Sequence, residues 1–260
     1  MKKALSYTLF FVGIQILVSS IVIAILNVLG YQQWTTSPYT SIASSVLSAA
    51  ITAALFLRMR WTETSSDYLR SKPRLVILWS ILAALGAVIP SIAVQEQFPE
   101  LPNIVEQEMG AIMNAHGGYF TIALLMPLIE EMVFRGAILR SLLQWKPEKP
   151  WAMIAVSALL FALIHMNPAQ MPHAFVIGLL LGWMFYRTNS IVPTVAFHWT
   201  NNTIAFILFK LYPDPNIKLI DILGSQRSVA AAVLFSLFIL VPAIYQLHLW
   251  MKRPNTPSVV

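Results

Sequence analysis

The sequence predicts an all-α protein, a polytopic transmembrane helix bundle with about eight spanning helices. Of its 260 residues, 57% are hydrophobic and 11% are charged, whereas a soluble domain carries about 25% charged residues. Eight apolar segments reach or approach the roughly 20 residues that a spanning helix needs. These observations predict an integral, multi-pass membrane protein in which residues 1–260 form a single transmembrane domain.

The eight predicted helices follow one another with mostly short connections. The first follows two lysines, as a signal peptide would, but its apolar run far exceeds the about 7–15 residues of a signal-peptide core, so we expect a retained helix. The fifth and sixth are short and are separated by only a few residues, which leaves a seven-helix alternative open. The segments are 5–29, 39–57, 75–94, 118–143, 151–166, 172–188, 191–210 and 228–250.

The charges in the loops support eight helices. With both termini in the cytoplasm, only three of the 17 Lys and Arg residues lie on the outer side: Lys210, Lys218 and Arg227. The inner side includes Lys252 and Arg253, which follow the last helix. The loop after the third helix carries glutamates and no basic residue, as the positive-inside rule requires of an outer loop. We therefore expect a plasma-membrane protein with both termini cytoplasmic.

Composition also excludes several classes of function. The net charge of +6 does not indicate a nucleic-acid partner, because the basic residues mark membrane orientation and do not gather on one surface. The chain has no cysteine, which excludes disulfides, thiolate metal sites and a cysteine nucleophile. The expected partners are the lipid bilayer and a membrane-associated substrate, and the sequence leaves the oligomeric state unknown.

Charged residues inside the fourth predicted helix give the strongest functional signal. Glu130, Glu131 and Arg135 lie in the sequence EEMVFR, within a long apolar stretch. Each charge at membrane depth costs about 2.5–3.5 kcal/mol on insertion scales, so packing alone does not account for them. Glu131 and Arg135 are spaced i,i+4 with the acid first, the better orientation for a helical ion pair. Glu130 lies about 100° further round the helix, which makes it the candidate general base.

Two other predicted helices carry polar pairs. The fifth contains FALIH, with Phe161 and His165 four residues apart, and the seventh contains HWTNN, with His198 and Asn202 four residues apart. Each pair therefore shares a helix face. Counted with a rise of 1.5 Å per residue, these polar groups and Glu130 lie roughly 11 to 21 Å from the inner surface of a core about 30 Å thick. The sequence thus predicts one site near the middle of the bundle.

Each of these groups also has a simpler interpretation. The charges in the fourth helix could form only an interhelical ion pair. His165 could be an interfacial side chain, and His198 and Asn202 could simply join helices by hydrogen bonds. The joint occurrence of all three sets favours a functional site. Three further histidines are interpreted as loop or interface residues without a catalytic role: His116, His173 and His248.

The three motifs, in this order and each on its own predicted helix, resemble those of the CPBP family, which includes the type II CAAX prenyl proteases and the bacteriocin-processing Abi proteins. The family's motifs are EExxxR, FxxxH and HxxxN or HxxxD. In this chain they are residues 130–135, Phe161 to His165, and His198 to Asn202. The resemblance covers about residues 118–210, the expected catalytic core.

The resemblance implies an intramembrane endopeptidase with its active site inside the bundle. Its substrates would be membrane-embedded or lipid-anchored peptides, of the CAAX type or like bacteriocins. By the same resemblance, Glu130 and His165 would activate the attacking water, and His198 and Asn202 would stabilise the tetrahedral oxyanion. The supporting residues would be Glu131, Phe134, Arg135 and Phe161, with Glu131 and Arg135 holding the first motif helix in register.

The sequence leaves the role of a metal unknown. Glu130, His165 and His198 match a catalytic zinc set with an open position, so a divalent metal such as zinc is one alternative. The chain has no HExxH motif, and asparagine is a poor zinc ligand but a good hydrogen-bond donor. These two observations favour a glutamate mechanism without a metal.

Two other classes of function stay open. The chain could be a catalytically silent membrane scaffold or immunity protein of the same fold, since a motif does not prove activity. It could also be a proton-coupled transporter, because buried carboxylates and histidines build proton pathways. The transporter is disfavoured because the polar residues cluster at one depth and the chain shows no paired inverted halves.

Overall fold

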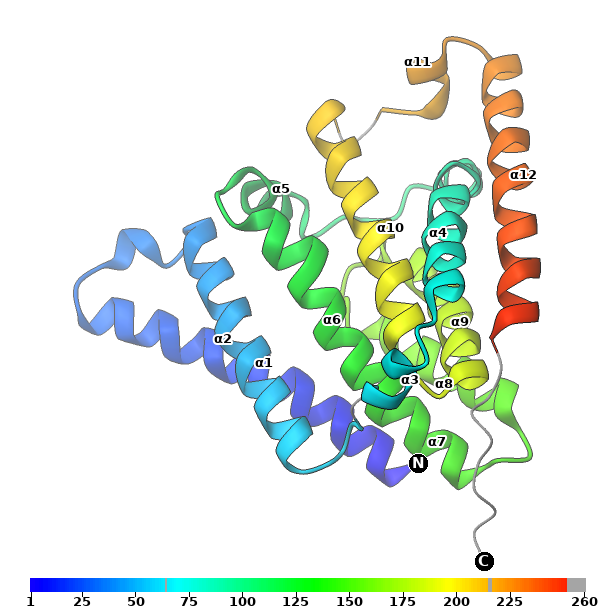
Figure 1. Cartoon of the computed structure of the whole chain (residues 1–260). Coiled ribbons are helices and arrows are strands. Elements are labelled where there is room, and N and C mark those ends of the chain that lie inside the picture. Colours follow the sequence, from blue (N-terminus) through cyan, green and yellow to red (C-terminus); the bar gives the residue numbers. More distant parts are fainter. Residues whose placement is uncertain (64, 215–216, 252–260) are drawn as a thin grey trace, which may run out of the picture. The chain divides into compact units, whose positions relative to one another are not determined.

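The structure is a computed structural model that describes residues 1–63, 65–214 and 217–251 (Figure 1). Lys252 and Arg253, which the sequence places on the inner side, lie outside the described residues. All regular secondary structure in the described ranges is helical, which confirms the all-α fold class.

Each of the eight predicted helices corresponds to an observed helical segment. Within the described residues, four helices are long and apolar enough to cross a membrane, namely α1, α2, α4 and α12. Eight spans therefore stay a prediction. The segments are α1 (Lys2–Val28), α2 (Pro38–Arg58), α4 (Arg74–Gln95), a continuous helix from Phe120 to Trp145, α8 (Pro150–Leu163), α9 (Met171–Thr188), α10 (Val192–Leu211) and α12 (Gln226–Trp250).

Short helices that the sequence does not predict lie in the connections. They are too short to give a hydropathy signal. The longest, α5 in the connection that follows α4, carries Glu108, whose carboxylate accepts a hydrogen bond of 2.9 Å from the hydroxyl of Ser41 on α2. The short helices are η1 (Gln32–Trp34), α3 (Ser66–Arg70), α5 (Glu106–Asn114) and α11 (Leu219–Leu223).

The chain divides into two compact units. The first comprises residues 1–64 and 103–182, and therefore holds α1, α2, α5, the continuous helix, α8 and the first part of α9. The second comprises residues 65–102 and 183–260, with α3, α4, the end of α9, α10, α11 and α12. The prediction of a single domain is not tested by this division.

The continuous helix of the first unit is not a regular α-helix. Its four parts are η2 (Phe120–Leu125), α6 (Met126–Glu131), η3 (Met132–Leu139) and α7 (Arg140–Trp145), and η2 and η3 are π-helices. A change from α to π winding disturbs the i→i−4 ladder, and nearby hydroxyls often bond the released carbonyls. Here Thr62 Oγ1 donates to the carbonyl of Met132 at 2.7 Å, and Ser157 Oγ donates to that of Phe134 at 3.3 Å.

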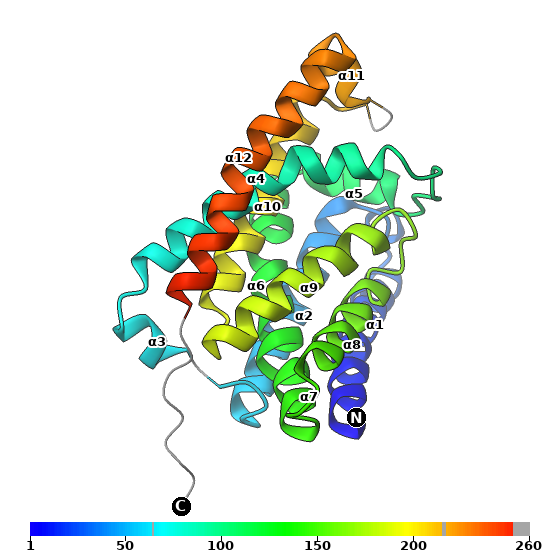
Figure 2. The ribbon, with the colours of Figure 1, turned by 90° about the vertical axis from the view of Figure 1, so that its right-hand side faces the viewer.

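Helices α8 and the first part of α9 pack closely, and they run side by side in Figure 2. A Cβ atom added at Gly178 would lie 2.9 Å from the Cβ of Ala158, and one at Gly182 would lie 2.7 Å from Cγ2 of Ile154. Glycines spaced i,i+4 are a common way for helices in membranes to bring their backbones together. The backbone of α9 can therefore reach the residues around η3.

In the second unit, α4 packs against both α10 and α12 (Figure 1). The crossing of α4 and α12 is close, because a Cβ atom at Gly86 would lie 2.6 Å from the backbone nitrogen of Leu240. Arg187 near the end of α9 binds the last carbonyls of α12, with Nη2 2.9 Å from the oxygen of His248 and Nε 3.1 Å from that of Met251. These contacts fix the ends of α12 and α9 within this unit.

Candidate functional site

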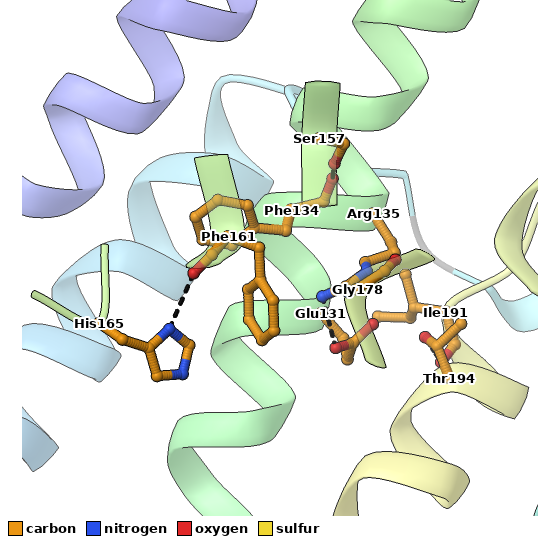
Figure 3. A network of polar contacts seen from close by, with 9 residues as sticks. All are labelled: Glu131, Phe134, Arg135, Ser157, Phe161, His165, Gly178, Ile191 and Thr194. Atoms are coloured by element: carbon orange, nitrogen blue, oxygen red, sulfur yellow. Dashed lines mark hydrogen bonds and ion pairs between the residues drawn. The ribbon is translucent and has the colours of Figure 1, made fainter. Parts of the chain in front are cut away.

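A buried ion pair lies at the centre of the first motif. Nη1 of Arg135 donates to Oε1 of Glu131 at 2.8 Å, and the two side chains are 1% and 0% exposed (Figure 3). This is the pair that the i,i+4 spacing predicts. Removing one partner of a buried pair strands the other charge at a cost of about 3–5 kcal/mol, so the pair holds α6 and η3 in a fixed arrangement.

Arg135 also joins the first motif helix to two other helices. Its Nη2 donates to the carbonyl oxygen of Gly178 on α9 at 3.4 Å. Its Cζ lies 4.4 Å from the centre of the Phe161 ring on α8, a cation–π distance. The absence of a side chain at Gly178 allows the first of these contacts, because it lets the α9 backbone approach. Arg135 is therefore the point at which three helical segments of the first unit meet.

The two phenylalanines predicted to support the site form a line of ring contacts. Phe134 packs edge-on against Phe161, with ring centres 5.2 Å apart, and against Phe11 of α1 at 5.9 Å. Phe161 in turn meets the ring of His165 edge-on at 4.9 Å. Such geometry places the positive edge of one ring on the negative face of another. Figure 3 shows the Phe161 ring between His165 on one side and the Glu131–Arg135 pair on the other.

His165 lies just beyond the end of α8 and not on the helix. The predicted helix runs to residue 166, but α8 ends at Leu163, and Met166 has a left-handed backbone with φ of 50°. The face shared with Phe161 is nevertheless kept, because Nδ1 of His165 lies 2.8 Å from the carbonyl oxygen of Phe161 (Figure 3). That carbonyl belongs to the last turn of α8, where carbonyls lack helical partners.

This hydrogen bond fixes the tautomer of His165. A carbonyl oxygen only accepts, so Nδ1 must carry the hydrogen. In the neutral imidazole ring, Nε2 then carries the lone pair and can act as a base or a hydrogen-bond acceptor. The ring is half-buried. His165 is therefore oriented by its own helix, with one defined atom left for chemistry.

The two adjacent carboxylates of the first motif have different surroundings. Glu131 is fully buried in its pair with Arg135, whereas Glu130 is half-buried. The ion pair of Glu131 is the one that the sequence predicts, and the role of Glu130 as the base stays a prediction.

The third motif lies on α10 in the second unit. His198 is 5% exposed and Asn202 is half-buried, on one face of a regular α-helix. The side-chain amide of Asn201 donates to Oδ1 of Asn202 at 3.3 Å. Because Oδ1 accepts this bond, Nδ2 of Asn202 is the donor that an oxyanion would need.

The structure brings together six of the predicted residues in the first unit. They share the contacts described above or adjoin them on α6, and they are Glu130, Glu131, Phe134, Arg135, Phe161 and His165. His198 and Asn202 belong to the second unit. The meeting of the four catalytic candidates in one site stays a prediction.

Sequence reasoning missed several residues that hold this arrangement. Gly178 supplies the carbonyl for Arg135, and its i,i+4 spacing with Gly182 is a signal that the sequence does contain. Thr62 and Ser157 bond the carbonyls of the π-wound segment, and nothing in their local sequence marks them. Asn167, which the sequence places in a helix connection, is fully buried.

The donor side chains bear on the metal alternative. In residues 1–63, 65–214 and 217–251, no group of three or more His, Cys, Asp or Glu side chains is arranged to hold a metal ion. The donors of the predicted zinc set are His165, His198 and Glu130, and of these His165 offers only Nε2.

Comparison with known proteins gives one match. Residues 114–204 match the model of the family described as Type II CAAX prenyl endopeptidase Rce1-like. The matched segment contains all three motifs, residues 130–135, 161–165 and 198–202. No curated protein and no solved structure matches the chain. The family match agrees with the resemblance that the ordered motifs predict.

Proposed function

We propose that this chain, which belongs by its residues 114–204 to the CPBP family of intramembrane proteases, cleaves peptide bonds in lipid-anchored or membrane-embedded substrates. The family description supports an endopeptidase of the CAAX type. A CAAX substrate carries a prenyl group on its cysteine, so it would reach the site from the membrane. The apolar helices α1, α2, α4 and α12 are consistent with that setting.

In the proposed reaction, Glu130 and His165 activate the attacking water. The Glu130 carboxylate accepts a proton from the water, and Nε2 of His165 accepts a hydrogen bond from it. The resulting hydroxide forms a bond to the carbonyl carbon of the substrate. When the tetrahedral intermediate collapses, Glu130 returns the proton to the leaving amine, which completes hydrolysis.

His198 and Asn202 stabilise the negative charge that develops on the substrate oxygen. An N–H of His198 and Nδ2 of Asn202 donate hydrogen bonds to this oxyanion. Loss of one such donor in an acyl-transfer site typically slows the reaction by about 10²–10³-fold. The buried position of His198 favours this role, because a donor in a dry site is worth more than one in water.

One structural observation carries the proposal for the first unit. Nδ1 of His165 is committed to the carbonyl of Phe161, and Glu131 is committed to Arg135. The same short region therefore carries two groups that hold the structure, a histidine whose Nε2 is a defined acceptor, and the half-buried carboxylate of Glu130 on the residue beside Glu131.

The test is cleavage of an internally quenched, farnesylated CAAX peptide by the purified full chain in proteoliposomes. Glu130→Gln, His165→Ala and His198→Ala should each abolish cleavage, and Asn202→Ala should reduce it by about 10²–10³-fold. Matched controls are Glu100→Gln and His116→Ala, both exposed outer-loop residues, which should leave the rate unchanged. Full activity of Glu130→Gln would remove the proposed base.

The same assay decides between a glutamate and a metal mechanism. A strong chelator should leave wild-type cleavage unchanged if Glu130 and His165 act alone. Loss of cleavage with chelator, restored by added zinc, would instead assign Glu130, His165 and His198 as ligands. A folded wild type that cleaves neither this peptide nor bacteriocin-like peptides would favour the silent scaffold.

We also propose a plasma-membrane location with cytoplasmic termini. Exposed basic residues lie in and beside the connection between α2 and α4, among them Arg58, Arg60 and Lys72. Because the chain has no cysteine, single cysteines can be introduced cleanly at Gln107 and Arg60. A membrane-impermeant maleimide added to intact cells should label Gln107→Cys and not Arg60→Cys. Labelling of Arg60→Cys alone would reverse the orientation.

A further inference from the structure

Asn167 is a fully buried polar side chain that no proposed reaction step uses. It is 0% exposed, and both ends of its amide are occupied. Nδ2 donates to Oδ1 of Asn103 at 2.8 Å, and Oδ1 accepts from the backbone nitrogen of Ile104 at 3.2 Å. All these residues lie in the first unit. The side chain of Asn167 thus fastens the outer loop that precedes α5 to the turn that follows α8.

His165 lies in the same turn, two residues before Asn167. The nitrogen of Ile164 still bonds the carbonyl of Leu160 at 3.2 Å, but the next two residues make i→i−3 hydrogen bonds, from His165 to Ala162 at 3.2 Å and from Met166 to Leu163 at 3.1 Å. Met166 has its left-handed φ of 50° and a side chain that is 67% exposed, so it adds little packing. The hydrogen bond from Nδ1 orients the ring, but it does not hold the chain that carries the ring.

Asn167 is the first residue after the end of α8 that is held by several hydrogen bonds. Besides the two side-chain bonds, its carbonyl accepts from the backbone nitrogens of Gln170 at 2.9 Å and Met171 at 3.2 Å, where α9 begins. The backbone of His165 is therefore held between the last turn of α8 and Asn167. Loss of the Asn167 hydrogen bonds would let the His165 ring shift relative to the Phe161 carbonyl.

We propose that Asn167 is a positioning residue, which acts through its hydrogen bonds to Asn103 and Ile104 to keep Nε2 of His165 in place for the attacking water. The inference rests on the proposed function for its effect on rate. Its effect on the His165 ring is independent of that function. The outer loop, although exposed, becomes part of the support of the site.

The kinetic test uses the farnesylated CAAX peptide and the full chain in proteoliposomes. Asn167→Ala should lower kcat roughly 10- to 100-fold, as expected for a misplaced catalytic group, with little change in KM. Asn103→Ala should lower kcat in the same way but less. Because both remove the same hydrogen bond, the double variant should be no slower than Asn167→Ala. Asn167→Asp keeps the acceptor for Ile104 and should lie between wild type and Asn167→Ala.

The matched control is Gln107→Ala, an exposed residue on the same outer segment, which should leave kcat unchanged. Unchanged kcat in Asn167→Ala would overturn the inference while leaving the proposed function intact, because the wild type still cleaves. An effect on KM alone, or additive losses in the double variant, would also overturn it. Failure of the wild type to cleave would count against the proposed function, not against the positioning role.

A spectroscopic measurement tests the positioning role without any substrate. The chain has five histidines, so ¹⁵N-histidine labelling gives few ring signals, and His165→Ala identifies the one of interest. In the wild type, His165 should show the tautomer with the hydrogen on Nδ1. Asn167→Ala should convert it to a mixture of tautomers while the other signals stay unchanged. An unaltered His165 signal in this variant would overturn the inference.

Discussion

The helix that carries Glu130 and Glu131 and the helix that carries His198 and Asn202 are held by different kinds of contact. The first changes between α and π winding, and side chains from other segments, Thr62 and Ser157, bond its carbonyls. Helix α10 is regular, begins with a proline in its first turn, and bonds its own carbonyls. Its threonines do this locally, Thr200 to Ala196 at 2.8 Å, for example.

This difference shows that two motifs of one predicted site can depend on very different parts of the chain. The geometry of the first motif depends on residues as far away as Thr62 and Gly178. On α10, the hydroxyl of Thr200 bonds a carbonyl of the same helix, and the helix packs against α4. Loss of a single hydroxyl bond should therefore disturb Glu130 and Glu131 more than His198 and Asn202.

The largest effect is expected from removal of the Arg135 guanidinium, which contacts three helical segments. Arg135→Ala leaves the carboxylate of Glu131 buried without this cation, which should lower the free energy of unfolding by about 3–5 kcal/mol. The matched control is Arg70→Ala, because Arg70 and Asp67 are 3.7 Å apart and 82% and 95% exposed. The control should show no measurable change. Denaturant unfolding in detergent, followed by tryptophan fluorescence, measures both, and equal effects would contradict the central role of Arg135.

The Arg135 pair is also where sequence reasoning succeeded best, because it depends on local geometry. An i,i+4 spacing fixes which side chains meet on one helix, and the same holds for Phe161 and His165. Hydropathy located the eight long helical segments for a similar reason, since an apolar run needs no partner to be recognised. These features required only the periodicity of a single helix.

The missed features all depend on distant contacts or on helix ends. Nothing local marks the hydroxyl of Thr62 as the partner of a carbonyl 70 residues later. The end of α8 at Leu163 was missed because the apolar run continues through Ile164 and the first polar stop is His165. The sequence also does not indicate the π winding of η3, because the residues of this segment are all buried and so show no polar face.

A second prediction concerns the contact between α8 and α9. Gly178→Ala places a methyl group 2.9 Å from the Cβ of Ala158 and 3.0 Å from its Cα. This overpacking should destabilise the protein by about 1–3 kcal/mol and draw the Gly178 carbonyl away from Arg135. Proteolytic activity should fall with it, because Arg135 would lose one of its three contacts.

Gly13→Ala is the matched control for this substitution. Gly13 lies within α1, and a Cβ atom there meets nothing within 4 Å. Replacing an unhindered helical glycine by alanine stabilises a helix by about 0.5–1 kcal/mol, so the sign of the effect should be opposite. Thermal unfolding of both variants in one detergent measures the difference. Stabilisation by Gly178→Ala would show that α9 does not depend on this close approach.

A third prediction concerns the hydroxyl that bonds the π-wound segment. Thr62→Val keeps the shape of a side chain that is 4% exposed but removes its 2.7 Å hydrogen bond to the Met132 carbonyl. Leaving a buried carbonyl without this donor should cost about 1–3 kcal/mol. Amide hydrogen exchange should rise in residues 132–139 and not in α10. Protection that stays unchanged in η3 would mean that Thr62 does not maintain the winding.

The smallest effect is expected from the equivalent change in α10. Thr200→Val also removes a hydroxyl hydrogen bond to a carbonyl, but this bond runs to Ala196 within the same helix. Such i−4 bonds are weakly favourable at best, because the carbonyl already belongs to the helical ladder. The free energy of unfolding should therefore change by no more than about 0.5 kcal/mol, and hydrogen exchange in α10 should stay the same. If Thr200→Val were as damaging as Thr62→Val, both motif helices would depend on their hydroxyls alike, and the contrast between a carbonyl bonded from another segment and one bonded within its own helix would be lost.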